Sequence, residues 1–256
     1  MMILKSTIGM MKKIIKNNEI KMLQFDRLGS DCNIFHFITT RNAEIEDIDA
    51  SHIVIPSQTH EDEILAIDDD FLFLSEDKQA ELLDGVDALI TDLPDVCVGV
   101  KTADCVPILL YAPDKKVVAA IHAGWRGTVL QIAAKVVAYM ISHYGVQPSA
   151  ILAGIAPSIS QDAFEVGEEV AEAFAESSDQ YLDLSEVIAY NHNTSKAHIN
   201  LWEANRQQLI KAGLEPANIE VAGICTYSNT DVFYSARRSG ITTGRMISGI
   251  IIKPSI

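Results

Sequence analysis

The chain has 256 residues, of which 48 % are hydrophobic and 21 % charged, enough apolar content for one buried core of ordinary globular size. Acidic residues outnumber basic ones 35 to 20, and the formal charge of −15 argues against nucleic acid or an anionic membrane as partner. No run of 18 apolar residues is present, and the lysine-containing N-terminus lacks a signal-peptide cleavage pattern. We therefore expect a cytoplasmic protein.

No repeat, low-complexity tract or flexible linker divides the sequence. We assign residues 22–256 to a single catalytic domain and residues 1–21 to an N-terminal extension, either helical or frayed. Short runs rich in Val and Ile alternate with stretches of helical period, a pattern typical of a sheet with helices packed on it. The expected fold class is therefore α/β or α+β.

Apolar runs predict the following strands: 53–55, 88–90, 97–102, 106–111, 117–122, 151–154, 219–222, 232–235 and 247–252. Apolar residues at three- and four-residue steps predict helices over 128–144, 167–177 and 201–212. Gly145 directly follows the first of these helices, as a C-terminal glycine does. A further strand-like run precedes Arg41.

The four cysteines of the chain are widely spaced and form no CxxC pair: Cys32, Cys97, Cys105 and Cys225. In a cytosolic chain of this size such cysteines favour free core thiols, a metal ligand or a nucleophile over a disulfide framework. Composition does not separate these alternatives.

Two predicted strands flank the segment APDK (112–115), whose Pro-Asp pair favours a turn between them. A turn centred between Pro113 and Asp114 places Cys105 directly opposite His122 in an antiparallel hairpin. Opposed residues have Cβ atoms about 4.5–5.5 Å apart, close enough for a thiolate and an imidazole to share a metal or a proton. A slip of one residue would put the two side chains on opposite faces.

The chain leaves this hairpin through AGWRGT (123–128), which places two glycines and Arg126 between a strand and a helix start. Free amides of a first helical turn, together with a guanidinium, favour an anion such as phosphate. Glycines also occupy such turns for steric reasons alone. Both interpretations stay open on this pattern.

Several motifs resemble a known family: TADC (102–105), AIHAGWRGT (120–128), FEVGEEV (164–170) and CTYSNTDVFYSARRSGITTGR (225–245). They are similar to the YfiH-type family, also called the laccase-domain or polyphenol-oxidase family, which includes purine nucleoside phosphorylases. The similarity covers roughly residues 23–252 in family order. The resemblance implies a mixed-sheet sandwich with flanking helices, similar to the deamidase domain of cytotoxic necrotizing factors.

The resemblance also implies a metal site of two histidines and one cysteine. The family's Gln-x-His motif is matched at 58–60, so that His60, Cys105 and His122 become the ligands. Zinc favours such nitrogen and sulfur ligands, and three of them leave a fourth position open for water or substrate. Copper binds the same ligand set. The remaining histidines are interpreted as surface or core residues: His36, His52, His143, His192 and His198.

Family members cleave purine nucleosides with phosphate and deaminate adenosine. The resemblance therefore implies a zinc-dependent purine nucleoside phosphorylase, acting on adenosine, inosine or methylthioadenosine, with adenosine deaminase activity. Phosphate requires a positive pocket, for which Arg41 and Arg126 are our candidates because a guanidinium binds phosphate in a fork. Asp104 is expected to orient a ligand histidine, to hold a ribose hydroxyl or to act as a structural cap. Three further arginines match family positions without an assigned role: Arg237, Arg238 and Arg245.

The sequence departs from the family pattern in three places. Asn42 and Ala43 replace glycines after the Thr-Thr-Arg motif at 39–41, Glu61 replaces a glycine, and 156–158 reads Ala-Pro-Ser in place of Gly-Pro-Cys. The three expected ligands are intact. The departures therefore bear on substrate preference rather than on metal binding.

Other classes of function stay open. A copper-dependent, laccase-like polyphenol oxidase would use the same ligands, although the chain lacks the several histidine clusters of a multicopper oxidase. A metal-free Cys-His hydrolase would use Cys105 as nucleophile and His122 as base. A non-catalytic binding protein has little support, because no exposed amphipathic stripe is evident.

Overall fold

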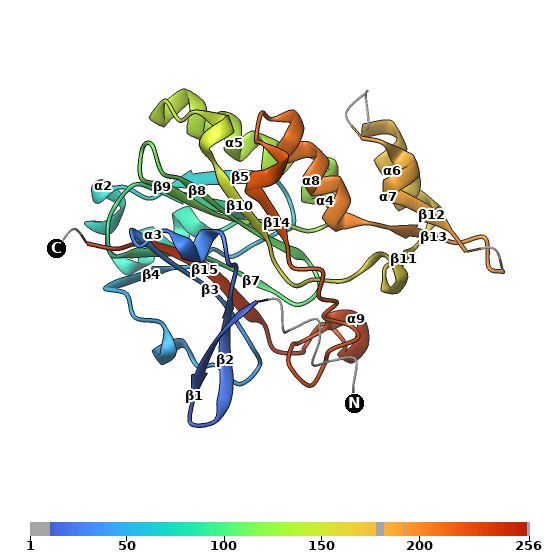
Figure 1. The fold of residues 1–256 in the computed structure, drawn as a ribbon, viewed down its shortest axis with the longest axis horizontal. Coiled ribbons are helices and arrows are strands. Elements are labelled where there is room, and N and C mark those ends of the chain that lie inside the picture. The colour runs from blue at the N-terminus through green and yellow to red at the C-terminus, as the bar shows by residue number, and fades with distance from the viewer. Residues whose placement is uncertain (1–10, 178–181, 192, 255–256) are drawn as a thin grey trace.

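Two six-stranded sheets pack face to face in the computed structural model, which describes residues 11–177, 182–191 and 193–254 (Figure 1). In order across the first sheet, its strands are β1 (Lys12–Lys16), β2 (Glu19–Gln24), β3 (Ile34–Thr39), β15 (Met246–Ile252), β7 (Val96–Thr102) and β4 (His52–Val54). β4 pairs with β7 in parallel, whereas the other neighbours in this sheet are antiparallel.

The second sheet carries the hairpin predicted from the sequence. Its strands, in order, are β14 (Ile219–Val221), β10 (Leu152–Ile155), β8 (Val106–Ala112), β9 (Val117–Ala123), β6 (Val86–Thr91) and β5 (Glu63–Ala66). Parallel pairs at both edges flank antiparallel pairs in the middle, so the predicted mixed-sheet sandwich is confirmed. A small third sheet joins β11 (Glu165–Val166), β13 (Ala197–Ile199) and β12 (Ile188–Tyr190).

Helices α5 (Ile132–Tyr144) and α8 (Leu201–Lys211) pack together on the outer side of the second sheet (Figure 1). The other helices are α2 (Asp69–Leu72), α3 (Glu76–Leu83), α4 (Trp125–Val129), α6 (Glu168–Ser177), α7 (Leu184–Val187) and α9 (Ala236–Ser239). Within the described ranges, no helix has the length and apolar character needed to cross a membrane.

The core follows from the alternation of side chains along the central strands. In β8, Ile108 and Leu110 belong to the cluster that packs under α5 and α8. Leu109 and Tyr111 point the other way, into the cluster between the two sheets. A strand that is buried on both faces has an unbroken run of apolar residues in its sequence. The sequence therefore predicts β8 and β9. The metal-binding candidates lie at the end of this hairpin.

The predicted helix 128–144 is in fact two helices. Gln131 adopts a left-handed backbone conformation with φ of 62°, which ends α4 and starts α5 in a new direction. The apolar spacing of residues 128–144 continues across the break between α4 and α5, so periodicity alone does not reveal the break. Gly145 is the left-handed residue after α5, as predicted.

Two other expectations need correction. Residues 12–21, expected to be helical or frayed, form β1 and part of β2, which pair as a hairpin at the edge of the first sheet. Residues 232–235, expected to be a strand, form a turn and a loop, whose chain direction is set by hydrogen bonds from Val232 and Phe233 to Asn229. The strands of the third sheet were not predicted, because runs of two or three residues carry no period. Residues 1–10 lie outside the described ranges.

Candidate metal centre and substrate cavity

The three predicted ligands come together from three elements of the fold. His60 lies in the loop between β4 and β5, Cys105 directly precedes β8, and His122 is next to last in β9. Their ligand atoms all lie within 4.8 Å of one another, and the two imidazole rings meet edge to face. His122 is buried, Cys105 is half-buried and His60 is exposed. The trio therefore connects the core to the surface.

The hairpin register differs from the prediction by two residues. His122 pairs with Pro107 rather than with Cys105, and Ala112 pairs with Val117 across a four-residue loop. The predicted two-residue loop, Pro113-Asp114, is wrong. The tight two-residue hairpin turns need a positive φ at their first residue, whereas proline is restricted to a φ of about −65°. A shift of two residues preserves the face, so Cys105 still lies on the same side of the hairpin as His122.

Asp87, on the neighbouring strand β6, organises two of the ligands. Its carboxylate is fully buried and accepts hydrogen bonds from the backbone N–H groups of Thr59 (3.3 Å), His60 (3.1 Å) and Glu61 (2.8 Å). It also accepts a hydrogen bond from Nδ1 of His122 at 2.6 Å. An ionised carboxylate only accepts, so Nδ1 carries the proton and Nε2 of His122 is left to bind a metal.

Sequence reasoning missed Asp87 and offered only Asp104 for the orienting role, as one of three alternatives for that residue. The available signal was a single carboxylate inside the apolar run GVDALIT (85–91). A buried charge in a strand requires partners, because burial of an unpaired carboxylate is costly. Its partners, however, come from a loop and a strand that are about 26 to 35 residues away in the chain.

The electrostatics of the trio favour a thiolate beside an imidazolium when no metal is bound. Burial alone raises the pKa of Cys105, but the neighbouring charge of His122 and hydrogen bonds with both histidines lower it to about 6. Burial alone lowers the pKa of His122, but Cys105 and Asp87 raise it to about 9. A thiolate is the form of cysteine that binds metals and attacks electrophiles.

Two glycines of the AGWRGT segment make room for this arrangement. A Cβ on Gly124 would lie 3.3 Å from the ring of His60 and 3.4 Å from Sγ of Cys105. A Cβ on Gly127 would lie 2.9 Å from the carbonyl oxygen of Glu61. The steric interpretation of these glycines is therefore correct, and it serves the site, since both allow the His60 loop to approach β9.

These residues fit a metal ion. The donor set of one thiolate and two imidazoles suits zinc or copper, and bonds of about 2.0–2.3 Å from one ion span nearly the separation of the donors. The hydrogen bond from Nδ1 of His122 to Asp87 holds the ring nitrogen that would not bind the metal, and metal-binding histidines usually have such a partner. Among the residues that the structure describes, this is the one His/Cys/Asp/Glu group arranged to hold a metal. His192 lies outside the described ranges.

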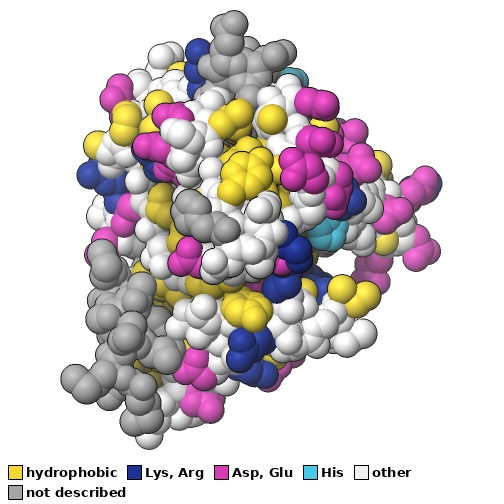
Figure 2. All heavy atoms as spheres, turned by 90° about the vertical axis from the view of Figure 1, so that its right-hand side faces the viewer, with side chains coloured by type: hydrophobic (Ala, Val, Ile, Leu, Met, Phe, Trp, Pro, Cys, Tyr) yellow, Lys and Arg dark blue, Asp and Glu magenta, His cyan; other side chains and the backbone are white. Residues whose placement is uncertain are grey.

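The trio opens into a cavity of about 760 Å³ with basic side chains around it. Four of its lining residues are cations: Lys101, Arg126, Arg237 and Arg245. On the face shown in Figure 2, basic side chains gather beside a hollow, with acidic ones next to them. In a protein with a formal charge of −15, this local excess of cations favours an anionic ligand.

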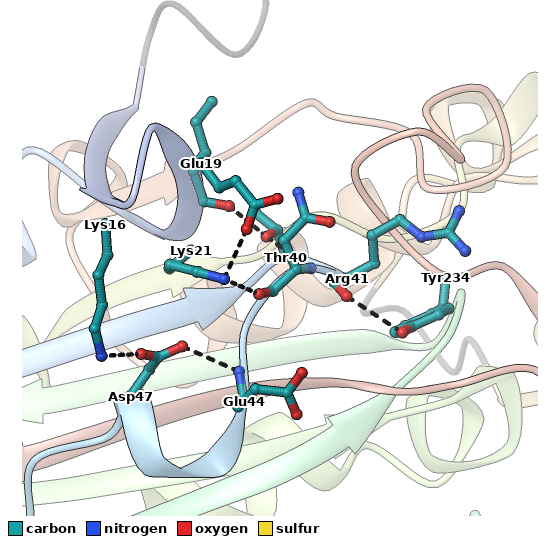
Figure 3. Close-up of polar contacts among 10 residues, drawn as sticks. Lys16, Glu19, Lys21, Thr40, Arg41, Glu44, Asp47 and Tyr234 are labelled. Carbon is teal, nitrogen blue, oxygen red and sulfur yellow. Dashed lines mark hydrogen bonds and ion pairs between the residues drawn. The ribbon is translucent and has the colours of Figure 1, made fainter.

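Arg126, a predicted phosphate ligand, lines this cavity, and its guanidinium lies over the ring of Trp125 at 4.4 Å. Arg41 is not among the lining residues. Its guanidinium donates a hydrogen bond to the carbonyl of Thr230 and lies 5.0 Å from the ring centre of Tyr234, whose hydroxyl donates to the Arg41 carbonyl (Figure 3). Arg41 therefore anchors the loop around 230–234, and its expected contact with phosphate is not supported.

Asp104 lines the cavity, but its carboxylate is already occupied. It accepts hydrogen bonds from the hydroxyls of Thr226 (2.6 Å) and Ser235 (3.0 Å) and from the backbone N–H of Arg237 (2.7 Å). Asp104 also has a φ of 93°, a conformation that is costly for a residue other than glycine. Its observed role is thus the structural cap, which ties the arginine-bearing segment to the residue before Cys105.

Comparisons with known proteins agree with this geometry. A family model described as "Multi-copper polyphenol oxidoreductase laccase" matches residues 38–253. A protein of Bacteroides thetaiotaomicron named purine nucleoside phosphorylase is 41 % identical over 263 residues, 91 % of this chain and 96 % of that one. Adenosine deaminase RL5, from an unknown prokaryotic organism, is 45 % identical over 206 residues, 80 % of this chain and 77 % of that one.

The crystal structure of the Bacillus licheniformis hypothetical protein YfiH superimposes with a TM-score of 0.81 at 27 % identity and covers 93 % of this chain and 98 % of that one. Fold, site and relatives together define an enzyme on a two-sheet α/β scaffold. The chain belongs to the multi-copper polyphenol oxidoreductase laccase family, the YfiH-type family of the sequence motifs. That resemblance is confirmed, whereas the similarity to the cytotoxic necrotizing factor domain stays a prediction.

Proposed function

We propose that this enzyme is a metal-dependent purine nucleoside phosphorylase that also deaminates adenosine. The observation that carries the proposal is the placement of His60, Cys105 and His122 in one cavity with Arg126 and other cations. The names of the two similar enzymes, purine nucleoside phosphorylase and adenosine deaminase, support the same substrate class.

Phosphorolysis requires a bound anion beside the sugar. A phosphate oxygen forms a bond to C1′ of ribose while the bond from C1′ to the purine nitrogen breaks, giving ribose 1-phosphate and the free base. Arg126 would hold and orient the phosphate, since a guanidinium offers two parallel donors to phosphate oxygens. The stacking of Arg126 on Trp125 reduces the freedom that binding would otherwise remove.

His60, Cys105 and His122 would hold the metal, for which we propose zinc because a Cys/His set with an open position is typical of catalytic zinc. When bound, the metal would supply Lewis-acid chemistry at this end of the cavity. Asp87 would keep the proton on Nδ1 of His122 and hold the His60 loop in place. Elemental analysis of protein purified without added metal distinguishes zinc from copper, whose affinity for such ligands is generally higher.

The direct test is to incubate the metal-loaded enzyme with adenosine, with and without phosphate, and to quantify the products by chromatography. We expect adenine and ribose 1-phosphate only when phosphate is present, and inosine in either case. The Cys105→Ala variant should form none of them. Absence of all three products with the parent enzyme would overturn the proposal.

A metal-free Cys-His hydrolase is the second candidate, and the thiolate–imidazolium pair of Cys105 and His122 favours it. Stoichiometric metal that is lost in Cys105→Ala supports the first candidate. Activity that survives chelation and is blocked by thiol alkylation supports the second. A laccase-like copper oxidase would instead show copper in the purified protein and oxidation of phenols.

A further inference from the structure

A second hollow opens beside the metal cavity. It has a volume of about 630 Å³ and shares three lining residues with that cavity: Trp125, Phe164 and Arg237. Its other walls come from the FEVGEEV segment at 164–170 and from the strand and turn around Lys196. FEVGEEV is one of the motifs that carry the family resemblance, and the proposed metal and phosphate sites leave it without a role.

The two hollows differ in the charged side chains that line them. The metal cavity carries the cations Lys101, Arg126 and Arg245, whereas the second hollow carries Glu165, Glu168 and Glu169. Lys196 pairs with Glu165 at 2.7 Å. No ion pair of Glu168 or Glu169 is found among the described residues, so these two carboxylates are available as hydrogen-bond acceptors. An anion fits the first hollow and a ligand rich in donors fits the second.

Arg237 forms the partition between the hollows and is fixed at both ends. Its backbone N–H donates to Asp104 at 2.7 Å, and Nη1 donates to the carbonyl oxygen of Glu165 at 2.7 Å. The guanidinium lies 5.3 Å from the ring centre of Phe164. Because one side chain borders both hollows, ligands in them would lie next to each other.

Gly167 lines the second hollow next to the carboxylate of Glu169. A Cβ at this position would lie 2.2 Å from Oε2 and 2.6 Å from Oε1 of Glu169. Glu169 is exposed, so a side chain at position 167 would make its flexible carboxylate rotate away from the backbone there. The backbone of Gly167 has no left-handed φ that would explain the glycine. A small substitution at Gly167 is therefore expected to move the Glu169 carboxylate.

We propose that the second hollow is the ribose subsite of the nucleoside, with Glu169 accepting hydrogen bonds from the sugar hydroxyls. Trp125 and Phe164 supply the apolar wall for the purine where the hollows meet. Phosphate on the arginine side and ribose on the glutamate side would then meet at the partition, as a two-substrate phosphorolysis needs. This inference rests on the proposed function for the identity of the ligand.

The test measures binding of inosine, which has no amino group to lose, to the full metal-loaded chain by calorimetry in the absence of phosphate. The comparison ligand is 2′,3′-dideoxyinosine, which lacks both hydroxyls. We expect the parent to bind inosine about tenfold more tightly than the dideoxy analogue, because a charged acceptor makes a strong hydrogen bond. Glu169→Gln should weaken inosine binding about tenfold and leave the analogue unchanged within about twofold.

The matched control is Glu176→Gln, on the same helix and away from the hollow, which should bind both ligands as the parent does. Gly167→Ala should reproduce the loss seen in Glu169→Gln, because it displaces the carboxylate, and the two changes combined should cost no more than either alone. Metal content should be equal in all variants. Three results would overturn the ribose subsite. Glu169→Gln could lose the same affinity for both ligands, it could keep the parent's affinity for both, or the parent could fail to bind inosine.

Failure of the proposed function has a different signature. If inosine binds with the expected hydroxyl dependence but adding phosphate yields no hypoxanthine and no ribose 1-phosphate, the phosphorylase assignment fails and the ribose subsite stands. If phosphorolysis occurs and Glu169→Gln has the inosine affinity of the parent, the subsite fails and the phosphorylase assignment stands.

Discussion

The two sides of the cavity are each organised by one buried aspartate, and the two aspartates work differently. Asp87 lies inside strand β6 and accepts from a ligand ring and from the loop of a second ligand. Asp104 lies in a bend with φ of 93° and accepts from the segment that carries Arg237. The metal side is thus an extension of the sheet core, whereas the arginine side is a loop in which Asp104 is the central acceptor.

This difference predicts that metal binding and anion binding respond to separate substitutions. The metal side depends on residues fixed by strand pairing on β8, β9 and β6. The arginine side depends on hydrogen bonds that cross about 122 to 133 positions of the chain. Substitutions on the metal side should leave anion binding largely intact, and substitutions on the arginine side should leave metal binding largely intact. The following experiments test this independence.

The largest effect is expected from removal of a metal ligand. Cys105→Ala should reduce the metal content to less than about one tenth and phosphorolysis by at least about 100-fold, since loss of a ligand costs more than loss of its supporting partner. Elemental analysis and the adenosine assay measure the two quantities. Cys32→Ala, at an exposed cysteine, is the matched control and should behave as the parent. If the Cys105→Ala variant binds metal fully and stays active, Cys105 is not a metal ligand and the proposed metal site is wrong.

Asp87→Asn tests the support of the metal side. The amide nitrogen of asparagine cannot accept from the N–H groups of the His60 loop, so metal affinity should fall about 10- to 100-fold. Competition with a chromophoric chelator measures the affinity. Asp92→Asn, an exposed change just after the same strand, serves as control. Parent-like metal affinity in Asp87→Asn would show that the ligands hold their positions without this carboxylate.

Asp104→Asn tests the arginine side. Asparagine tolerates the positive φ but offers one acceptor oxygen in place of two, so the segment carrying Arg237 loses part of its anchor. We expect the KM for phosphate to rise about tenfold with metal content unchanged. Asp231→Asn, exposed in the neighbouring turn, is the control. A parallel loss of metal would show that Asp104 also positions Cys105 and that the two sides are coupled.

The same contrast explains what the sequence could predict. The hairpin and Gly145 lie in local patterns of apolar residues and turn chemistry, which predict them. The trio of ligands follows from the family motifs that contain it. Asp87, Arg237 and the hydrogen bonds of Arg41 depend on tertiary contacts between distant segments, which no local period reveals. The predicted hairpin register was wrong because Pro113 excludes the two-residue loop, and the strands are joined by a four-residue loop instead.

The smallest expected effect concerns acid stability and separates unfolding from metal loss. Burial lowers the pKa of His36 on β3 to about 4, with a further contribution from Lys12, and its Nε2 accepts from the backbone N–H of Phe25 at 2.8 Å. Its pKa in the unfolded chain is about 6.5, so below this pH the unfolded state binds more protons and the folded state loses stability. The loss should reach about 1.4 kcal/mol at pH 5.5.

Denaturant unfolding of chelator-treated protein between pH 7 and 5 measures this slope without a contribution from the metal. His36→Gln should flatten the slope, because glutamine does not titrate, whereas His143→Gln on the exposed face of α5 should keep it. A slope unchanged by His36→Gln would assign the acid sensitivity to another group. With the His36 contribution known, metal loss measured above pH 6.5 can be attributed to the metal side of the cavity, since His36 contributes little to unfolding in that range.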